Sequence, residues 1–141
     1  MKYFKLAELI RSDTAKRLKI NNVPTDGETI RNLEALGNDI LDPIREMWGA
    51  PIYINSGFRS KKLNKAVGGA ATSQHVKGEA ADIDTRQGQQ ANAKLFAMIQ
   101  RSGLDFDQLI NEDSDRDGNP NWVHISYKRL GGNRNQVLTL H

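Results

Sequence analysis

The chain has 141 residues, a length that fits one domain with a single hydrophobic core over residues 1–141. It contains no cysteine, which excludes disulfide bonds, a thiol nucleophile and a metal site built on cysteine. The formal net charge of +3 gives a mild attraction to polyanions. The basic residues are scattered along the sequence without forming a basic helix face, so we expect no nucleic-acid partner.

The N-terminal sequence lacks the uninterrupted apolar segment of a signal peptide or a membrane span, because charges occur at Lys2, Lys5, Glu8 and Arg11. We therefore expect synthesis in the cytoplasm and no membrane contact. A target outside the cytoplasm would require another factor to release the protein.

Apolar residues at helical spacing predict a short first helix, which a break at residues 21–24 follows. Thr25 and Glu28 match a capping box that would begin a long amphipathic helix. Pro43 is expected to kink or split this helix, and Gly49 is expected to end it.

The rest of the chain alternates strand-like and helix-like segments. Short helices are expected from Ser60 and over residues 89–101. The segment 52–54 is rich in β-formers and predicts a strand. Further strands are expected over 80–84, 106–111, 122–127 and 136–140. Because regular βαβ alternation is missing, the sequence predicts an α+β fold with a small, mostly antiparallel sheet packed with helices.

The segment SQHVKGEAAD, residues 73–82, contains two good zinc ligands, the imidazole of His75 and the carboxylate of Asp82. Gly78 between them lets the chain turn. The same spacing also fits a hydrogen-bonded histidine in a turn, followed by a surface aspartate.

The segment NWVHISY, residues 121–127, places a histidine in an otherwise apolar strand. Alternation sends Trp122, His124 and Ser126 to one face and Val123 and Ile125 to the other. A face that carries a tryptophan and a histidine indicates the floor of a cleft. A core histidine with satisfied hydrogen bonds is the alternative.

Three segments in this order, SGFRS (56–60), SQHVKGEAADID (73–84) and NWVHISY (121–127), resemble the M15 metallopeptidases. This family includes zinc D-Ala-D-Ala carboxypeptidases and dipeptidases and phage endolysins, and the resemblance is strongest to its short phage and bacterial branch. It covers roughly residues 25–140 and implies the fold of the hedgehog and D-Ala-D-Ala peptidases. It also implies one zinc ion per chain, held by His75, Asp82 and His124.

The resemblance further implies a hydrolase that cuts peptide bonds next to D-amino acids in peptidoglycan stem peptides. The protein would then act on the cell wall as an endolysin, released within the host cell of a phage or prophage, or as a carboxypeptidase or endopeptidase that tailors the wall. We expect peptidoglycan as its partner and a monomeric protein.

Three protein ligands leave a position on zinc open for water. The arginine of the family matches Arg59, which is expected to hold a substrate carboxylate or the developing oxyanion. Ser73 and Trp122 are expected to line the substrate site, and Ser73 and Asp84 to orient the metal ligands. A salt bridge or helix cap is the alternative for Arg59, and a turn or cap is the alternative for Ser73 and Asp84.

The general base departs from the family pattern. Many M15 enzymes carry a Glu or Asp three residues before the last zinc histidine, where this chain has Asn121. Glu112 is the replacement candidate, because a register that pairs residues 112 and 122 would put it on the zinc face. Asp107 and Asp105 are the fallbacks. If none of them acts as a base, the alternative is a catalytically inactive, zinc-bearing wall-binding module.

The loop DSDRDG, residues 113–118, matches the opening of an EF-hand calcium loop. Asp113, Asp115 and Asp117 occupy the first three ligand positions, and Gly118 occupies the turn position. His124 stands where a glutamate normally closes the site, so a calcium site here would be incomplete. An ordinary solvated turn is the alternative.

Overall fold

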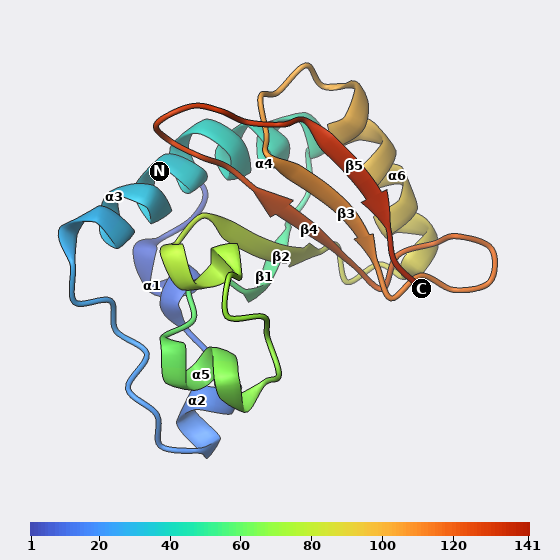
Figure 1. Ribbon diagram of the computed structural model, residues 1–141. Helices are drawn as coiled ribbons and strands as arrows, with labels where there is room; N and C mark the ends of the chain where they lie inside the picture. Colours follow the sequence, from blue (N-terminus) through green and yellow to red (C-terminus); the bar gives the residue numbers. More distant parts are fainter.

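The computed structural model describes residues 1–141. Five strands form one sheet in the order β1-β2-β4-β3-β5 (Figure 1). Neighbouring strands are antiparallel except for β3 and β5, which are parallel. The strands are β1 Tyr53–Ser56, β2 Ala80–Asp84, β3 Gln108–Glu112, β4 Trp122–Ser126 and β5 Gln136–Thr139. The predicted α+β class with a mostly antiparallel sheet is confirmed.

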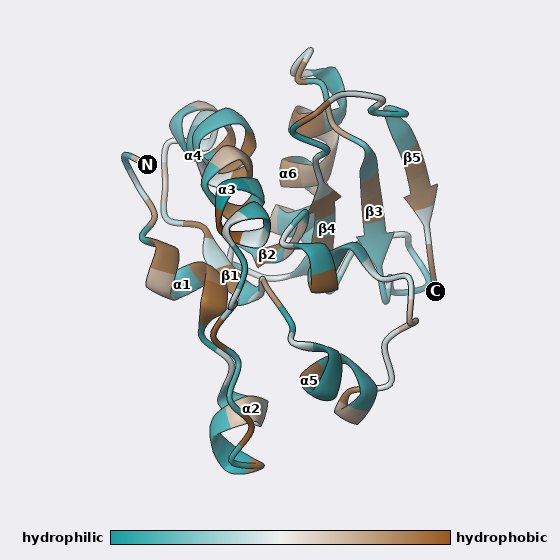
Figure 2. Ribbon diagram, turned by 60° about the vertical axis from the view of Figure 1, so that its left-hand side comes forward, coloured by the Kyte–Doolittle hydropathy of each residue, from teal (hydrophilic) through white to brown (hydrophobic).

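Three longer helical segments, α3, α4 and α6, lie on one side of the sheet (Figures 1 and 2). None of the helices is long and apolar enough to cross a membrane. The helical elements are α1 Leu6–Ile10, α2 Asp13–Arg17, α3 Gly27–Leu36, the π-helical turn η1 Gly37–Leu41, α4 Asp42–Trp48, α5 Lys61–Ala66, the 3₁₀ turn η2 Gln74–Lys77 and α6 Gln89–Arg101.

The core lies between these helices and one face of the sheet. Leu33, Leu95 and Ile99 from the helices pack in one cluster with Val123 and Ile125 of β4, and all five side chains are fully buried. Because side chains alternate along a strand, the residues between these core positions face the other side of the sheet. That second face carries the polar residues of β2, β3 and β4.

The long helical region differs from the sequence expectation at its start. The Asp26 side chain caps α3 by accepting a hydrogen bond from the Thr29 N–H, so the predicted cap at Thr25 is wrong by one residue. The region then runs through the π-helical turn η1 directly before Pro43, which lies in the first turn of α4. Proline has no N–H for the preceding turn, and the wider turn accommodates this. Gly49 ends the region with φ of 76°, as predicted.

The predicted bounds of β2 and α6 agree with the structure. The first strand begins at Tyr53 and extends to Ser56, and β3 begins at Gln108 rather than at residue 106. Two short helices, α2 and η2, were not predicted. Each of these two segments carries a single apolar residue, Ala15 in α2 and Val76 in η2, so neither shows a helical period.

Candidate metal centre and its cleft

Asp82 and His124 lie opposite each other on neighbouring strands. β2 and β4 are antiparallel, and their register pairs these two residues. Ile83 and Val123 point into the core, so Asp82 and His124 share the other face of the sheet. Nδ1 of His124 is 3.1 Å from Oδ1 of Asp82, and each residue is only 8% exposed.

His75 reaches the same place from η2, shortly before β2. The Ser73 hydroxyl accepts a hydrogen bond from the His75 N–H and caps this turn. Gly78 then leads the chain into β2 with φ of 74°. A Cβ at Gly78 would lie 2.8 Å from the carbonyl oxygen of Thr29, so this position requires glycine.

The tautomer of His75 follows from its surroundings. Its Nδ1 is 2.8 Å from the carbonyl oxygen of Gly57, which accepts hydrogen bonds only. Nδ1 therefore carries the proton and donates it. The other ring nitrogen, Nε2, points to Asp82 and is 3.4 Å from its Oδ2. A backbone carbonyl that orients an imidazole in this way is typical of metal-binding histidines.

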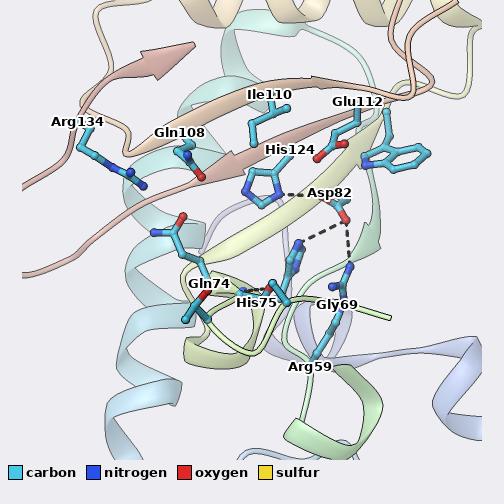
Figure 3. Close-up of a pocket in the computed structure, with 14 residues that line it drawn as sticks. Arg59, Gly69, Gln74, His75, Asp82, Gln108, Ile110, Glu112, His124 and Arg134 are labelled. Carbon is cyan, nitrogen blue, oxygen red and sulfur yellow. Dashed lines mark hydrogen bonds and ion pairs between the residues drawn. The ribbon is translucent and has the colours of Figure 1, made fainter. Parts of the chain in front are cut away.

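The donor atoms of His75, Asp82 and His124 converge (Figure 3). Each residue offers one ligand atom, and these atoms all lie within 4.8 Å of one another. Two imidazole nitrogens and one carboxylate oxygen are a donor set that suits zinc. Because Asp82 is buried beside both histidines, the alternative of a surface aspartate is wrong.

Asp82 is ionised in this setting. Burial by itself raises the pKa of Asp82, but the hydrogen bonds and positive charge of His124 and His75 outweigh burial and hold this pKa well below its ordinary value. A carboxylate must be deprotonated to bind a metal ion, so the residue is in its ligating form.

A cleft of about 450 Å³ opens over this donor set. Ile110, Glu112 and Trp122 line it from β3 and β4. Arg59 and Arg134 reach toward it from opposite sides, with the three candidate ligands between them (Figure 3). The opposite wall is formed by the loop before η2 and by η2 itself, through Gly69, Ala70, Thr72, Ser73, Gln74 and His75.

Glu112 lies on the cleft side of β3. The register pairs it with Trp122, as predicted, and the half-buried carboxyl group points toward the metal-ligand cluster (Figure 3). Burial raises the pKa of Glu112, and the negative charge of Asp82 raises it further. A carboxylate with a raised pKa is a stronger base than an ordinary exposed one and is therefore better suited to accept and return a proton.

The comparison with protein families agrees with this geometry. The family model described as Peptidase M15 matches residues 2–126, which include all three candidate metal ligands and Glu112. The chain belongs to the peptidase M15 family. The predicted resemblance is confirmed, and this M15 peptidase carries a His, Asp and His cluster that could bind the metal on which its family typically depends. A search of curated proteins gave no match.

Arg59 of this M15 peptidase is held beside the metal cluster. Its Nη2 is 3.5 Å from Oδ2 of Asp82, and its Nε donates to the Ser56 hydroxyl at 3.1 Å. Nη1 donates to the Asn64 side chain at 3.4 Å. The Arg59 side chain is only 18% exposed. Its salt bridge is therefore made with a site residue and within the cleft, and it is not a surface pair.

Asp84 shares its strand face with Asp82 but has a different environment. Its carboxylate accepts hydrogen bonds from the Arg86 N–H at 2.8 Å and from the Asn92 side chain at 3.1 Å. It makes no hydrogen bond to the three candidate ligands. Asp84 therefore shapes the turn between β2 and α6, in agreement with the alternative given for it.

Neither fallback base lines the cleft of this M15 peptidase. Asp107 is fully buried in an ion pair with Arg134, and the hydrogen bonds from Arg134 lower its pKa to about 2. Asp105 is exposed and accepts hydrogen bonds from Asn133 and Asn135. Both are therefore poorly placed to accept a proton at the metal centre.

Two of the three aspartates of the acidic loop accept hydrogen bonds from within the loop or from the residues that follow it. Asp115 accepts hydrogen bonds from the N–H groups of Asp117 and Asn119, and Asp113 accepts one from the Asn121 side chain. The structure has one cluster of candidate metal ligands, which is His75, Asp82 and His124, so the three aspartates of the loop do not converge. A calcium site at Asp113, Asp115 and Asp117 stays a prediction, and the contacts are those of a turn.

Among the cleft residues that were not singled out from the sequence, three have long polar side chains: Gln74, Gln108 and Arg134. Gln74 directly precedes His75, which is a local signal that could have indicated it. Gln108 begins β3 on the same face as Glu112, so its place follows from the strand period. Arg134 has no such signal, because only the folding of the segment after β4 brings it to the cleft.

Proposed function

We propose that this M15 peptidase is a zinc-dependent enzyme that hydrolyses peptide bonds next to D-amino acids in peptidoglycan stem peptides. One observation carries the proposal: His75, Asp82 and His124 converge beneath an open cleft, with Glu112 beside them. Peptidoglycan as substrate, one zinc ion per chain and a monomeric state come from the family resemblance. Action on the wall would require release from the cytoplasm, as for a phage endolysin.

Each residue of the site has a separate role in the proposed reaction. When bound by His75, Asp82 and His124, zinc would supply Lewis acidity, which polarises a peptide carbonyl and makes water more acidic. Glu112 would accept the proton of the attacking water and deliver it to the leaving amine. Arg59 would place its guanidinium on a substrate carboxylate or on the developing oxyanion.

A second candidate function rests on Asn121. This residue occupies the family position of the base, and an amide cannot accept a proton at neutral pH. Its side chain is exposed and donates to Asp113. A wall-binding module without catalysis would follow if no other base served. The position of Glu112 on the cleft side of β3 favours the enzyme.

Incubation with purified peptidoglycan tests the proposal. Soluble products are identified by mass spectrometry for the zinc-loaded protein, for the protein with a chelator and for the chelated protein after zinc is restored. We expect new amine termini next to D-amino acids only in the first and third samples. Glu112→Gln is the matched control, because it keeps the size of the side chain and removes the base.

The outcomes separate the two functions. Wall binding by the wild type without any released peptide would support the binding module. Cleavage that is unaffected by complete metal removal would contradict the metallopeptidase.

A further inference from the structure

Arg134 lies on the connection between β4 and β5 and is fixed at the edge of the cleft. Its Nε and Nη2 donate to the two carboxylate oxygens of Asp107, at 3.0 and 2.8 Å. The Arg134 N–H donates to the same carboxylate at 3.1 Å. Nη1 has no hydrogen-bond partner in the structure, and the side chain is 51% exposed and lines the cleft. This leaves one arm of the guanidinium available to a ligand.

Asp107 holds this arrangement from inside the protein. Its side chain is 0% exposed, and it also accepts a hydrogen bond from the Gln74 side chain at 2.9 Å. A buried carboxylate is costly to leave unpaired, so it keeps its partners in place. The Asp107 carboxylate therefore fixes both Arg134 and Gln74, the residue that precedes His75.

A second cation lies near the buried carboxylate, because Lys128 Nζ is 3.9 Å from Oδ1 of Asp107. Lys128 also interacts with the carboxyl group of Glu79 and does not line the cleft, so Arg134 is the cation that the cleft presents at this end. A role confined to neutralising Asp107 would not require a guanidinium with one arm open to the cleft.

The two glutamines beside Arg134 present acceptors to the cleft. Gln74 uses its Nε2 on Asp107, and Gln108 uses its Nε2 on Gln136 at 2.7 Å. No hydrogen bond uses the Oε1 of Gln74 or of Gln108. Figure 3 shows both side chains between Arg134 and the metal cluster. The N–H groups of a peptide ligand that extends toward Arg134 would donate hydrogen bonds to these oxygens.

We propose that Arg134, held by Asp107, forms a second carboxylate-binding end of the cleft, opposite Arg59. The enzyme would then select acidic peptides that carry one carboxylate on each side of the bond that is cut. This inference rests on the proposed peptidase function and specifies its substrate class. Arginine is suited to the task because its planar donors match carboxylate geometry.

The test uses the soluble peptide that the peptidoglycan assay shows to be cleaved, synthesised in four forms. One form keeps the carboxylates on both sides of the scissile bond, two forms carry a carboxamide on one side, and the last carries carboxamides on both. For the wild type, we expect each amide to raise KM about tenfold, as the loss of one charged hydrogen bond would. The kcat should change much less.

Arg134→Gln assigns one of the two carboxylates to its end of the cleft. This variant should lose discrimination at one position only, keep discrimination at the other and retain zinc. Arg134→Lys should recover part of the preference, because it restores the charge without the fork. Arg129→Gln is the matched control: it removes the same charge from a residue that donates to Asn32 and does not line the cleft, so it should keep both preferences.

Equal KM values for all four peptides in the wild type would overturn the second carboxylate end while leaving the peptidase intact. Unchanged discrimination in Arg134→Gln would overturn its assignment to this residue. If Arg134→Gln does not fold, the proposal is tested by the KM values of the wild type and of Arg134→Lys for the four peptides. Failure of the wild type to cleave any peptidoglycan peptide would instead count against the proposed function.

Discussion

Replacing Asp107 with asparagine keeps the shape of the side chain and removes its charge. In the wild type the carboxylate is fully buried and is paired with Arg134 through two hydrogen bonds. The substitution leaves the Arg134 guanidinium without its anionic partner. It also weakens the hydrogen bond from Gln74, because an amide oxygen is a poorer acceptor than a carboxylate.

The pKa of Asp107 gives the size of the effect. The hydrogen bonds from Arg134 lower this pKa from its ordinary value of 3.8 to about 2, against the opposing effect of burial. At about 1.36 kcal/mol per pKa unit, this difference corresponds to roughly 2.4 kcal/mol of folding free energy at neutral pH. Salt screening at the half-exposed Arg134 reduces it, so we expect Asp107→Asn to cost about 2 kcal/mol.

Urea unfolding of both proteins from pH 7 to pH 2 measures the difference, with a chelator in every sample so that metal release does not contribute. The folded pKa of Asp107 lies below the unfolded one. The stabilisation is therefore complete above about pH 4 and is lost as the pH falls toward about 2. The difference between the wild type and Asp107→Asn should shrink over this window. At neutral pH the melting temperature should fall by about 4–8 °C.

Asp105→Asn is the control, because this exposed carboxylate lies two residues away and bonds only to the amides of Asn133 and Asn135. It should change stability by less than about 0.5 kcal/mol. A loss in Asp107→Asn that is as large at pH 2 as at pH 7 would show that packing, and not the ion pair, is responsible. No loss at pH 7 would refute the reasoning outright.

Four further predictions concern the metal centre and the acidic loop. His124→Ala should reduce zinc from about one per chain to a small fraction, because the two remaining ligands bind the metal poorly. Elemental analysis measures the zinc content, and a metal-free wild type with full activity would contradict this prediction. Glu112→Gln should keep zinc and fold while kcat falls roughly 10²-fold or more. Since burial and the charge of Asp82 raise the pKa of Glu112, this carboxyl group should titrate above the ordinary 4.5 in the metal-free protein, which NMR of the chelated protein measures, and a value at or below 4.5 would contradict its placement beside Asp82. Arg59→Ala should chiefly raise KM, whereas a fall in kcat alone would place its contact in the transition state. Calorimetric titration of the zinc-loaded protein should show no binding at millimolar calcium, because Asp113 and Asp115 already accept hydrogen bonds within the loop and the three aspartates do not converge. A measurable heat of binding would support the calcium site.

Periodicity in the sequence was sufficient to predict the longer helices and strands. It was also sufficient to predict which face of β4 carries His124. Alternation placed His124 on the face opposite Val123 and Ile125, and the structure has these two side chains in the core. The bounds of β2 and α6 were also predictable, because strand and helix periods are local properties of side-chain placement. The short helix α2 was not predicted, because its only apolar residue is Ala15 and a single residue shows no period.

The sequence also identified the candidate ligands, through residue chemistry and family resemblance together, but not their geometry. His75 and Asp82 are seven positions apart, and His124 lies a further forty-two along the chain. Their convergence within 4.8 Å depends on the antiparallel register of β2 with β4 and on the carbonyl of Gly57 that orients His75.

The sequence placed Glu112 on the metal face through the expected pairing of residues 112 and 122, and it kept Asp107 as a fallback base. Only the tertiary structure showed that Asp107 is held in an ion pair, because its partner Arg134 lies twenty-seven residues away in the chain. Residue type and local period are encoded in neighbouring positions. Burial, ion pairing and pKa arise from partners that are distant in the chain, so they become definite only when the chain has folded.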